Sequence, residues 1–198
     1  MAVKTITVAI TGASGGVYAQ RLLWHLERSD EVGRVHLVVS APGRRVLAEE
    51  LDVAGSGDAL VESLVGGPSE KIDLVPSSDI GAKIASGSYP VDGMAIVPCS
   101  MSTIGALASG AVTNLVHRAA DVMLKERRTL IIVPRETPMS LPQLRNMTLC
   151  AEAGAMLMPA MPAFYQMPKT LDDLADFMAG KILAALGFAH DLYPSWEG

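Results

Sequence analysis

Short apolar runs recur along this chain, separated by longer amphipathic stretches. The runs lie at residues 6–10, 35–39, 93–97 and 129–133, with a shorter candidate at 156–158. Runs that are apolar at almost every position are typical of strands buried on both faces of a parallel sheet. Helical patterns lie between and after them, at residues 17–28, 43–51, 57–65, 101–109, 113–127, 140–153 and 171–187. The alternation predicts an α/β fold of three layers, in which helices cover both faces of a doubly wound parallel sheet.

The length and composition fit one such sheet with its helices. The chain has 198 residues, 49% of them hydrophobic, and contains no internal repeat or low-complexity linker. A chain of this size can bury a full core within one domain. We therefore expect a single domain over residues 1–198. Residues 66–92, rich in Gly, Ser and Pro, are interpreted as a loop that could carry function.

Polar residues follow each of the four clear strands. In doubly wound folds of the Rossmann or flavodoxin-like kind, ligands bind outside the carboxyl ends of the strands. Three of these strand ends are rich in hydroxyl residues and the fourth presents an Arg–Glu pair, in segments 11–16, 40–43, 98–103 and 134–138. Hydroxyl groups and free helix N-terminal amides suit phosphate groups and polar ring edges. The sequence thus predicts a nucleotide site at this edge of the sheet.

The glycine-rich turn after the first strand, TGASGG at residues 11–16, matches only part of a dinucleotide fingerprint. Tyr18 stands at the position of its last glycine, and Ser40 replaces the acidic residue that binds a ribose. Residues 165–169 imitate a dehydrogenase Tyr-x-x-x-Lys motif, but Pro168 prevents the two residues from sharing a helix face. No Gly-Lys-Ser/Thr of a P-loop follows the glycines. A mononucleotide is therefore the favoured ligand.

Basic residues border apolar runs in the second half of the chain. Arg118 and Lys125 are seven residues apart and face the same side of a predicted helix. Arg135, with Glu136, follows the next strand, and these cations are expected to converge on a second anion site at the strand ends. Residues 126–128 are interpreted instead as a solvated charged face.

Charge and residue usage argue against several classes of protein. The net charge of −5 argues against general nucleic-acid binding. No apolar run is long enough to span a membrane, and residues 1–10 lack a signal-peptide pattern. Cys99 and Cys150 form no Cys-x-x-Cys pair, and the four histidines show no metal-ligand spacing and are expected at the surface or lightly buried. We expect a reduced, cytoplasmic protein without a metal.

A set of motifs, in order along the chain, carries a resemblance to one family: TGASG at 11–15, IASGS at 84–88, DGMAIVPCS at 92–100, RAADVMLKERR at 118–128, VPRETP at 133–138 and PAFYQMP at 162–168. With them the chain resembles the UbiX-type flavin prenyltransferases, which share their fold with the phosphopantothenoylcysteine decarboxylases. The resemblance implies transfer of a dimethylallyl group from dimethylallyl phosphate to N5 and C6 of reduced FMN, without a metal. The product, prenylated FMN, would serve a UbiD-type decarboxylase.

The same resemblance implies roles for individual residues. FMN would be bound by residues of the strand ends, namely Gly12, Ala13, Ser14, Ser40, Ser100, Met101, Ser102, Thr103 and Arg135. The donor would be held by Arg118, Lys125, Arg135, Tyr165 and Lys181. The catalytic residues would be Ser14 beside flavin N5, Glu136 in proton transfer, Lys125 at the phosphate, and Glu50, an acid often supplied by a neighbouring subunit. Without a metal, Arg and Lys side chains must neutralise the leaving phosphate.

The chain departs from the family pattern at three positions. Ile80 is aliphatic where many members place an aromatic residue over the prenyl group. Lys181 stands where Arg is common, and Ser102 where Lys often occurs. These departures bear on the rate and on the choice between a phosphate and a diphosphate donor, rather than on the reaction class.

The resemblance further implies a large homo-oligomer, typically a dodecamer, with the flavin at subunit interfaces. The Met- and Pro-rich residues 156–162 suit such an interface, although core packing is their ordinary interpretation. Two other functions stay open. One is a non-catalytic FMN carrier or accessory protein, which needs only the serine-rich turns. The other is an FMN-dependent decarboxylase of a small acid, which would use Glu136 or Cys99.

Overall fold

Parallel strands form one sheet in the order β3-β2-β1-β4-β5-β6. The computed structural model describes residues 3–193; residues 1, 2 and 194–198, which the single-domain prediction includes, lie outside the described residues. The strands are β1 (Lys4–Ile10), β2 (Val32–Val39), β3 (Ile72–Pro76), β4 (Gly93–Cys99), β5 (Thr129–Pro134) and β6 (Met156–Leu157). The order reverses between β1 and β4, and a doubly wound sheet binds ligands at this switch point.

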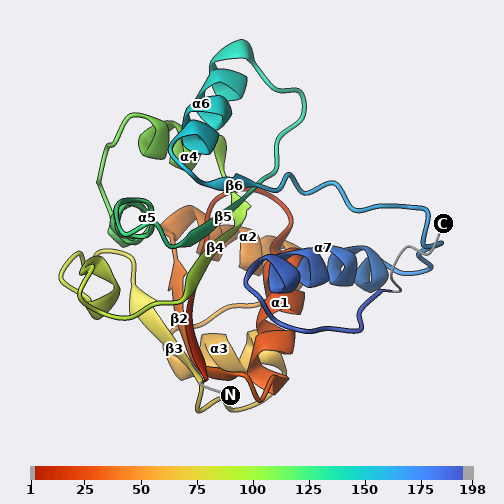
Figure 1. Cartoon of the computed structure of the whole chain (residues 1–198). Helices are drawn as coiled ribbons and strands as arrows, with labels where there is room; N and C mark the ends of the chain where they lie inside the picture. Colours follow the sequence, from red (N-terminus) through yellow and green to blue (C-terminus); the bar gives the residue numbers. More distant parts are fainter. Residues whose placement is uncertain (1–2, 194–198) are drawn as a thin grey trace.

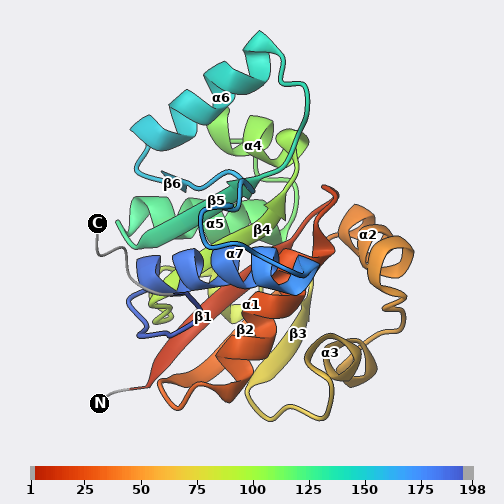
Figure 2. The ribbon, with the colours of Figure 1, turned by 90° about the vertical axis from the view of Figure 1, so that its right-hand side faces the viewer.

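Helices connect and cover the strands. They are α1 (Gly16–Arg28), α2 (Ala41–Leu51), α3 (Asp58–Val65), α4 (Met101–Ala108), α5 (Leu115–Lys125), α6 (Leu141–Glu152) and α7 (Leu171–Ala185), with a short 3-10 turn η1 (Lys83–Ala85). Figure 1 shows α1 and α7 on one side of the sheet and α5 on the other, and Figure 2 shows α7 beside α1 in front of the strands. This arrangement confirms the predicted three-layer, doubly wound α/β fold.

Two apolar cores hold the layers together. One lies between the sheet and α1, α3 and α7, and includes the fully buried Leu22 and Ile182. The other lies between the sheet and α4 and α5, and includes Ile104 and Ala120. Because both faces of the sheet are covered, β4 and β5 are apolar at almost every position, and β1 is buried from Ile6 to Ile10.

The prediction of a loop over residues 66–92 is wrong at β3. This strand pairs only with β2 at the edge of the sheet. Ile72 is buried, whereas Leu74 and Val75 are half-buried and Pro76 is exposed. An edge strand of this kind lacks the continuous apolar pattern that identifies the central strands. The other strands and helices agree with the predicted ranges to within about three residues at each end.

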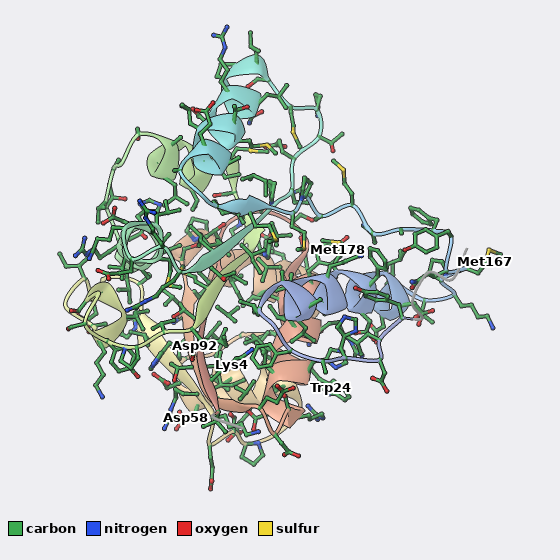
Figure 3. All side chains as sticks on the ribbon, viewed as in Figure 1. Lys4, Trp24, Asp58, Asp92, Met167 and Met178 are labelled. Atoms are coloured by element: carbon green, nitrogen blue, oxygen red, sulfur yellow. The ribbon has the colours of Figure 1, made fainter. Side chains whose placement is uncertain are left out.

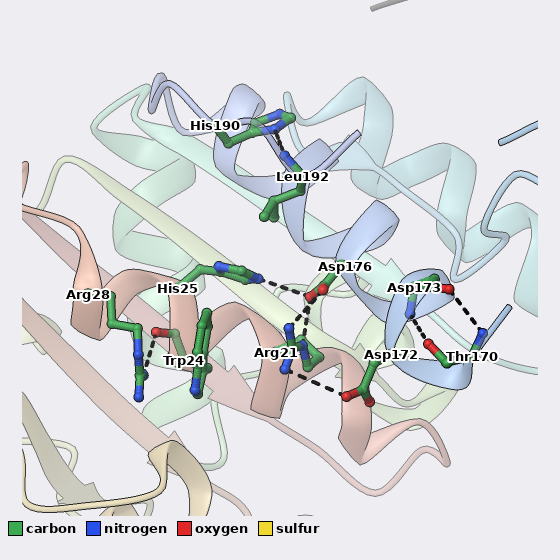
Figure 4. A network of polar contacts seen from close by, with 10 residues as sticks. All are labelled: Arg21, Trp24, His25, Arg28, Thr170, Asp172, Asp173, Asp176, His190 and Leu192. Carbon is green, nitrogen blue, oxygen red and sulfur yellow. Dashed lines mark hydrogen bonds and ion pairs between the residues drawn. The ribbon is translucent and has the colours of Figure 1, made fainter. Parts of the chain in front are cut away.

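A polar network fastens α7 to α1 (Figure 4). The Nε and NH2 groups of Arg21 donate hydrogen bonds to the two carboxylate oxygens of Asp176, at 2.6 and 2.7 Å. His25 Nε2 lies 2.9 Å from Asp176 Oδ1, and Arg28 stacks over the ring of Trp24 at 3.8 Å. A bidentate pair of this kind fixes orientation as well as distance. The network therefore sets where α7 presents its side chains.

Candidate functional site

The carboxyl ends of β1 and β4 meet at the switch point and are joined by Thr11. Its hydroxyl donates a hydrogen bond to the Pro98 carbonyl oxygen at 3.0 Å and accepts one from the Ser100 amide at 2.7 Å. Thr11 is only 2% exposed. These buried bonds fix the glycine-rich turn relative to the start of α4, so the predicted flavin residues of both strands share one edge.

The start of α2 lies against the first turn. A Cβ atom at Gly12 would lie 2.5 Å from Cβ of Pro42, and one at Gly43 would lie 2.6 Å from the Ile10 carbonyl oxygen. Ser40 caps α2, since its Oγ accepts a hydrogen bond from the Gly43 amide at 3.1 Å. The two glycines therefore allow the close approach that brings Ser40 to the end of β1.

A carboxylate from α2 occupies the N-terminus of α1. Glu50 Oε2 accepts hydrogen bonds from the amides of Gly15 at 2.9 Å and Gly16 at 2.8 Å. Partial burial raises the pKa of Glu50, but hydrogen bonds from Ser14, Gly15 and Gly16 and the charge of Arg135 outweigh it and hold that pKa below its ordinary value. A dinucleotide would place its pyrophosphate at this helix end. Glu50 already fills the position, in agreement with the incomplete fingerprint.

Arg135 reaches from the end of β5 to the same turn. Its Nε donates a hydrogen bond to the Ser14 carbonyl oxygen at 3.0 Å. Tyr18 packs beside it, where burial raises the pKa of the phenol and the charge of Arg135 partly opposes that rise. Glu136 follows, half-buried, and its Oε1 accepts a hydrogen bond from the Thr137 amide at 3.1 Å. The structure thus brings Ser14, Glu50 and Arg135 together, with Glu136 next in the chain.

Hydroxyl groups cluster at the start of α4. Ser100 Oγ lies 3.0 Å from Ser102 Oγ and 3.1 Å from Thr103 Oγ1, and it accepts a hydrogen bond from the Thr103 amide at 3.4 Å. Met101 and Thr103 are buried, whereas Ser102 is exposed. The N-terminus of α4 and its hydroxyl groups can donate hydrogen bonds to an anion, whereas the first amides of α1 donate to Glu50.

Arg118 and Lys125 face the same segment, residues 85–87, as their spacing predicts. This segment is not one of those that follow the carboxyl ends of the strands. Arg118 Nε donates a hydrogen bond to the Ala85 carbonyl oxygen at 3.0 Å, and a Cβ at Gly87 would lie 2.7 Å from Lys125 Nζ. Lys125 ends α5 shortly before β5 begins, so it lies toward the amino ends of the parallel strands. The predicted convergence with Arg135 is therefore not formed by Lys125 within one chain.

The interpretation of residues 126–128 as a solvated face is wrong for Arg128. Its guanidinium donates hydrogen bonds to the carbonyl oxygens of Gly87 at 2.7 Å and Tyr89 at 2.9 Å. Glu126 forms an ion pair with Lys125. Arg128 directly precedes a buried strand, and its charge alone does not predict these contacts. The signal that the sequence offers is the pair of motifs IASGS and LKERR, which face one another in the structure.

Tyr165 and Lys181 form a third group, around Phe177. The ring centres of Tyr165 and Phe177 lie 6.3 Å apart, and Lys181 Nζ lies 5.5 Å from the centre of the Phe177 ring. Tyr165 belongs to the segment between β6 and α7, which contains no helix, so residues 165–169 cannot act as a dehydrogenase motif. Figure 3 shows Met167, 78% exposed, at the outer end of this segment.

Both cysteines and two of the four histidines are buried. Cys99 is fully buried, and burial raises the pKa of its thiol far above the ordinary range, so it is not a nucleophile. His36 and His117 are buried, at the inner limit of the predicted range of surface or lightly buried histidines. The position of His36 inside the apolar run 35–39 is the signal for its burial. Within residues 3–193, no acidic, Cys or His cluster could hold a metal ion and no helix could cross a membrane.

Fold and strand-end chemistry together define a nucleotide-binding α/β protein, and the sequence matches the Flavoprotein family over residues 1–182. It is 46% identical over 191 residues to the flavin prenyltransferase UbiX of Halalkalibacterium halodurans, with 96% of this chain and 92% of that protein covered. The chain belongs to the UbiX flavin prenyltransferase family of flavoproteins.

Two solved structures are similar over almost the whole chain. The crystal structure of AnUbiX (PadA1) in complex with FMN and dimethylallyl pyrophosphate is 37% identical, with a TM-score of 0.89, and 99% of this chain and 98% of that chain are covered. A dodecameric FMN-dependent UbiX-like decarboxylase from Escherichia coli O157:H7 is 35% identical, with a TM-score of 0.87, and 98% and 100% of the two chains are covered.

Proposed function

We propose that this protein transfers the dimethylallyl group of dimethylallyl phosphate to N5 and C6 of reduced FMN. The observation that carries the proposal is 46% identity, across 96% of the chain, to a protein named as a flavin prenyltransferase. The solved relative that holds FMN and dimethylallyl pyrophosphate supports both substrate classes. Reduced FMN supplies the electron-rich positions that form the new bonds, and the protein positions the reactants.

The proposed flavin site is the edge formed by the ends of β1, β2, β4 and β5. Its residues are Gly12, Ala13, Ser14, Ser40, Ser100, Met101, Ser102, Thr103 and Arg135. The N-termini of α2 and α4 carry hydroxyl donors suited to the FMN phosphate. Glu50 already fills the N-terminus of α1, so the phosphate is assigned to one of the other two. The hydroxyl of Ser14, on the turn that Arg135 contacts, is hydrogen-bonded to Glu50 and keeps acceptor capacity for the flavin ring.

Proton transfer is assigned to Ser14, Glu50 and Glu136. The hydrogen bond between Glu50 and Ser14 connects the Glu50 carboxylate to the edge of the flavin site. Glu136 lies beside Arg135 at the end of β5. Carboxylates within reach of a reacting group act as general bases, and a neighbouring hydroxyl can relay the proton.

Donor binding is assigned to Arg118, Lys125, Tyr165 and Lys181, together with Arg135. In one chain these residues lie in three places, so a complete donor site requires neighbouring copies of the chain. The E. coli relative is described as dodecameric, and we propose a homododecamer here. The converging cations neutralise the leaving phosphate. Lys181 and Ile80, in place of Arg and an aromatic residue, bear on the choice between phosphate and diphosphate donors.

The product is proposed to pass to a UbiD-type decarboxylase, and the protein to work in the cytoplasm as one FMN-binding domain over residues 1–198. Two free, buried cysteines agree with a reducing compartment. The single sheet, which takes strands from both halves of the chain, agrees with one domain.

Mass measurement of the flavin tests the proposal. The protein is incubated without oxygen with reduced FMN and dimethylallyl phosphate, and the flavin is extracted and weighed. A gain of one isoprene unit is expected. Unmodified flavin, with FMN bound, would leave an FMN carrier instead. Carbon dioxide release from an added small acid would favour the activity named for the E. coli relative, although the buried Cys99 argues against a thiol-dependent reaction.

A further inference from the structure

A buried histidine connects the sheet to the segment that faces the basic residues of α5. His36, on β2, is 6% exposed, and both of its ring nitrogens have partners. Nδ1 lies 2.9 Å from Asp73 Oδ2 on β3, and Nε2 lies 2.9 Å from the hydroxyl of Tyr89. A carboxylate only accepts hydrogen bonds, so in the neutral ring Nδ1 donates to Asp73 and Nε2 accepts from Tyr89.

These three residues line one part of a cavity of about 540 Å³, with Arg34 and Lys83 at its other walls. The cavity lies beside the β2–β3 edge, under the chain that leads from β3 to β4. His36, Asp73 and Tyr89 direct their polar atoms at one another, and Asp73 also pairs with Arg34 at 3.8 Å. Because these polar atoms are already paired with one another, the group is a structural link between β2, β3 and Tyr89 rather than a set of free ligand-binding groups.

The opposite side of the same segment is held by basic side chains. The carbonyl oxygen of Ala85 accepts from Arg118, and those of Gly87 and Tyr89 accept from Arg128. Gly87 lies against the ends of the Glu126 and Lys125 side chains, so a Cβ atom at this position would displace them. Residues 86–90 are exposed or half-buried between the buried Ala85 and Val91. The Tyr89 hydroxyl thus provides a polar attachment to the sheet for a segment that has little apolar anchorage of its own.

We propose that His36 and Tyr89 are positioning residues for the donor phosphate. They hold residues 85–89 at a fixed height above the sheet, and this segment in turn orients the guanidinium of Arg118 and bounds the space open to Lys125. The inference rests on the proposed function, because that function assigns Arg118 and Lys125 to the donor. Neither His36 nor Tyr89 touches the donor itself.

Removal of the Tyr89 hydroxyl tests the structural link between His36 and Tyr89. In Tyr89→Phe the ring remains and the bond to His36 is lost. We expect residues 85–89 to exchange amide hydrogens faster, and the Kd for dimethylallyl phosphate, measured by calorimetry with oxidised FMN present, to rise about five-fold. The Kd for FMN and kcat at saturating donor should change less than two-fold. His36→Ala should raise the donor Kd further, and Tyr89→Phe carries the test if His36→Ala does not fold.

Ser69→Ala is the matched control. Ser69 Oγ accepts hydrogen bonds from Lys71 and Ile72 at the amino end of β3, so this variant loosens the same edge strand without touching residues 85–89. An unchanged donor Kd in Tyr89→Phe, or an equal rise in Ser69→Ala, would overturn the inference. If the wild-type protein binds the donor but never alters reduced FMN, the proposed reaction fails while the positioning role stands on the Kd values.

Discussion

Glu50 shows how one carboxylate can change what a familiar turn does. It satisfies the amides of Gly15 and Gly16 at the N-terminus of α1, and this contact closes the position that a pyrophosphate would need. Its pKa is depressed, so its contribution to stability is present above the unfolded pKa of about 4.3 and is lost as the pH falls toward the folded value.

Glu50→Gln is therefore expected to lower the thermal midpoint by about 2 °C at pH 7, because a neutral amide interacts less favourably with the helix dipole. The difference should shrink as the pH falls from the unfolded pKa of about 4.3 toward the lower pKa of Glu50 in the folded protein. Thermal unfolding monitored by circular dichroism at several pH values measures both. Glu49→Gln is the control, since Glu49 pairs with Arg45 on the exposed face of the same helix. Equal shifts in the two variants would contradict the assignment.

Glu136→Gln separates binding from proton transfer at the neighbouring strand end. The amide oxygen can still accept the hydrogen bond from the Thr137 amide, so we expect FMN binding to persist. The amide cannot take up a proton, so turnover should fall by a factor of about 10² to 10⁴. FMN titration and the rate of prenylated flavin formation test the two halves. Undiminished turnover would remove Glu136 from its proposed role.

At the scale of elements, the link between α1 and α7 is the contact most open to measurement. Asp176 is 19% exposed at its side chain and receives both Arg21 and His25 (Figure 4). Burial raises the pKa of Asp176, but the hydrogen bonds and charges of Arg21 and His25 outweigh it and leave that pKa lowered. The pair therefore stabilises the fold above the unfolded pKa and loses this effect as the pH falls.

We expect Asp176→Asn to reduce the free energy of unfolding by about 1–3 kcal/mol at neutral pH, because Arg21 loses a charged bidentate partner. Urea denaturation provides the measurement. The same experiment in acid should show a smaller difference. Asp172→Asn is the comparison, since Asp172 is 63% exposed and 3.7 Å from Arg21, and its loss should cost almost nothing. A similar loss in both variants would mean that general charge, not the bidentate contact, fastens α7.

At the scale of the whole molecule, exposed apolar side chains gather in one stretch of sequence. Most of the large exposed apolar residues in the described chain lie from α6 to the start of α7, namely Leu141, Leu144, Leu149, Met156, Met161, Phe164, Tyr165, Met167 and Leu171. Core packing, the ordinary interpretation of residues 156–162, is thus wrong for Met156 and Met161. Extended apolar surface of this kind favours contact with other copies of the chain.

A charge in this surface is expected to reduce the assembly. Phe164 is 69% exposed, and Phe164→Glu should shift the protein toward smaller species in analytical ultracentrifugation without loss of its helical signal. FMN prenylation should fall with the assembly, because the residues proposed to bind the donor and the flavin lie apart in one chain. Val3→Glu, at a 61% exposed position far along the sequence, should leave the sedimentation unchanged. An unaltered Phe164→Glu assembly would place the interface elsewhere.

Much of the fold could be predicted because buried parallel strands have a distinctive composition. β1, β2, β4 and β5 lie in apolar runs, and the polar residues after them mark one edge of the sheet. The sequence did not predict β3, because this strand is short and lies half-exposed at the edge of the sheet. The contacts of Arg128 were not predicted because a single charged side chain carries no periodic signal; only its partners, far along the chain, decide whether it is solvated.

The sequence by itself determined the α/β class, the nucleotide-binding strand ends and the family, since these follow from local patterns and ordered motifs. Tertiary structure decided which of those residues meet. It placed Glu50 on the α1 N-terminus and brought Arg135 to Ser14, and it kept Arg118 and Lys125 at residues 85–87, away from Arg135. For Lys125 the physical reason is chain direction: a helix that returns between parallel strands carries its last residues to the opposite end of the strands, whatever charges it bears.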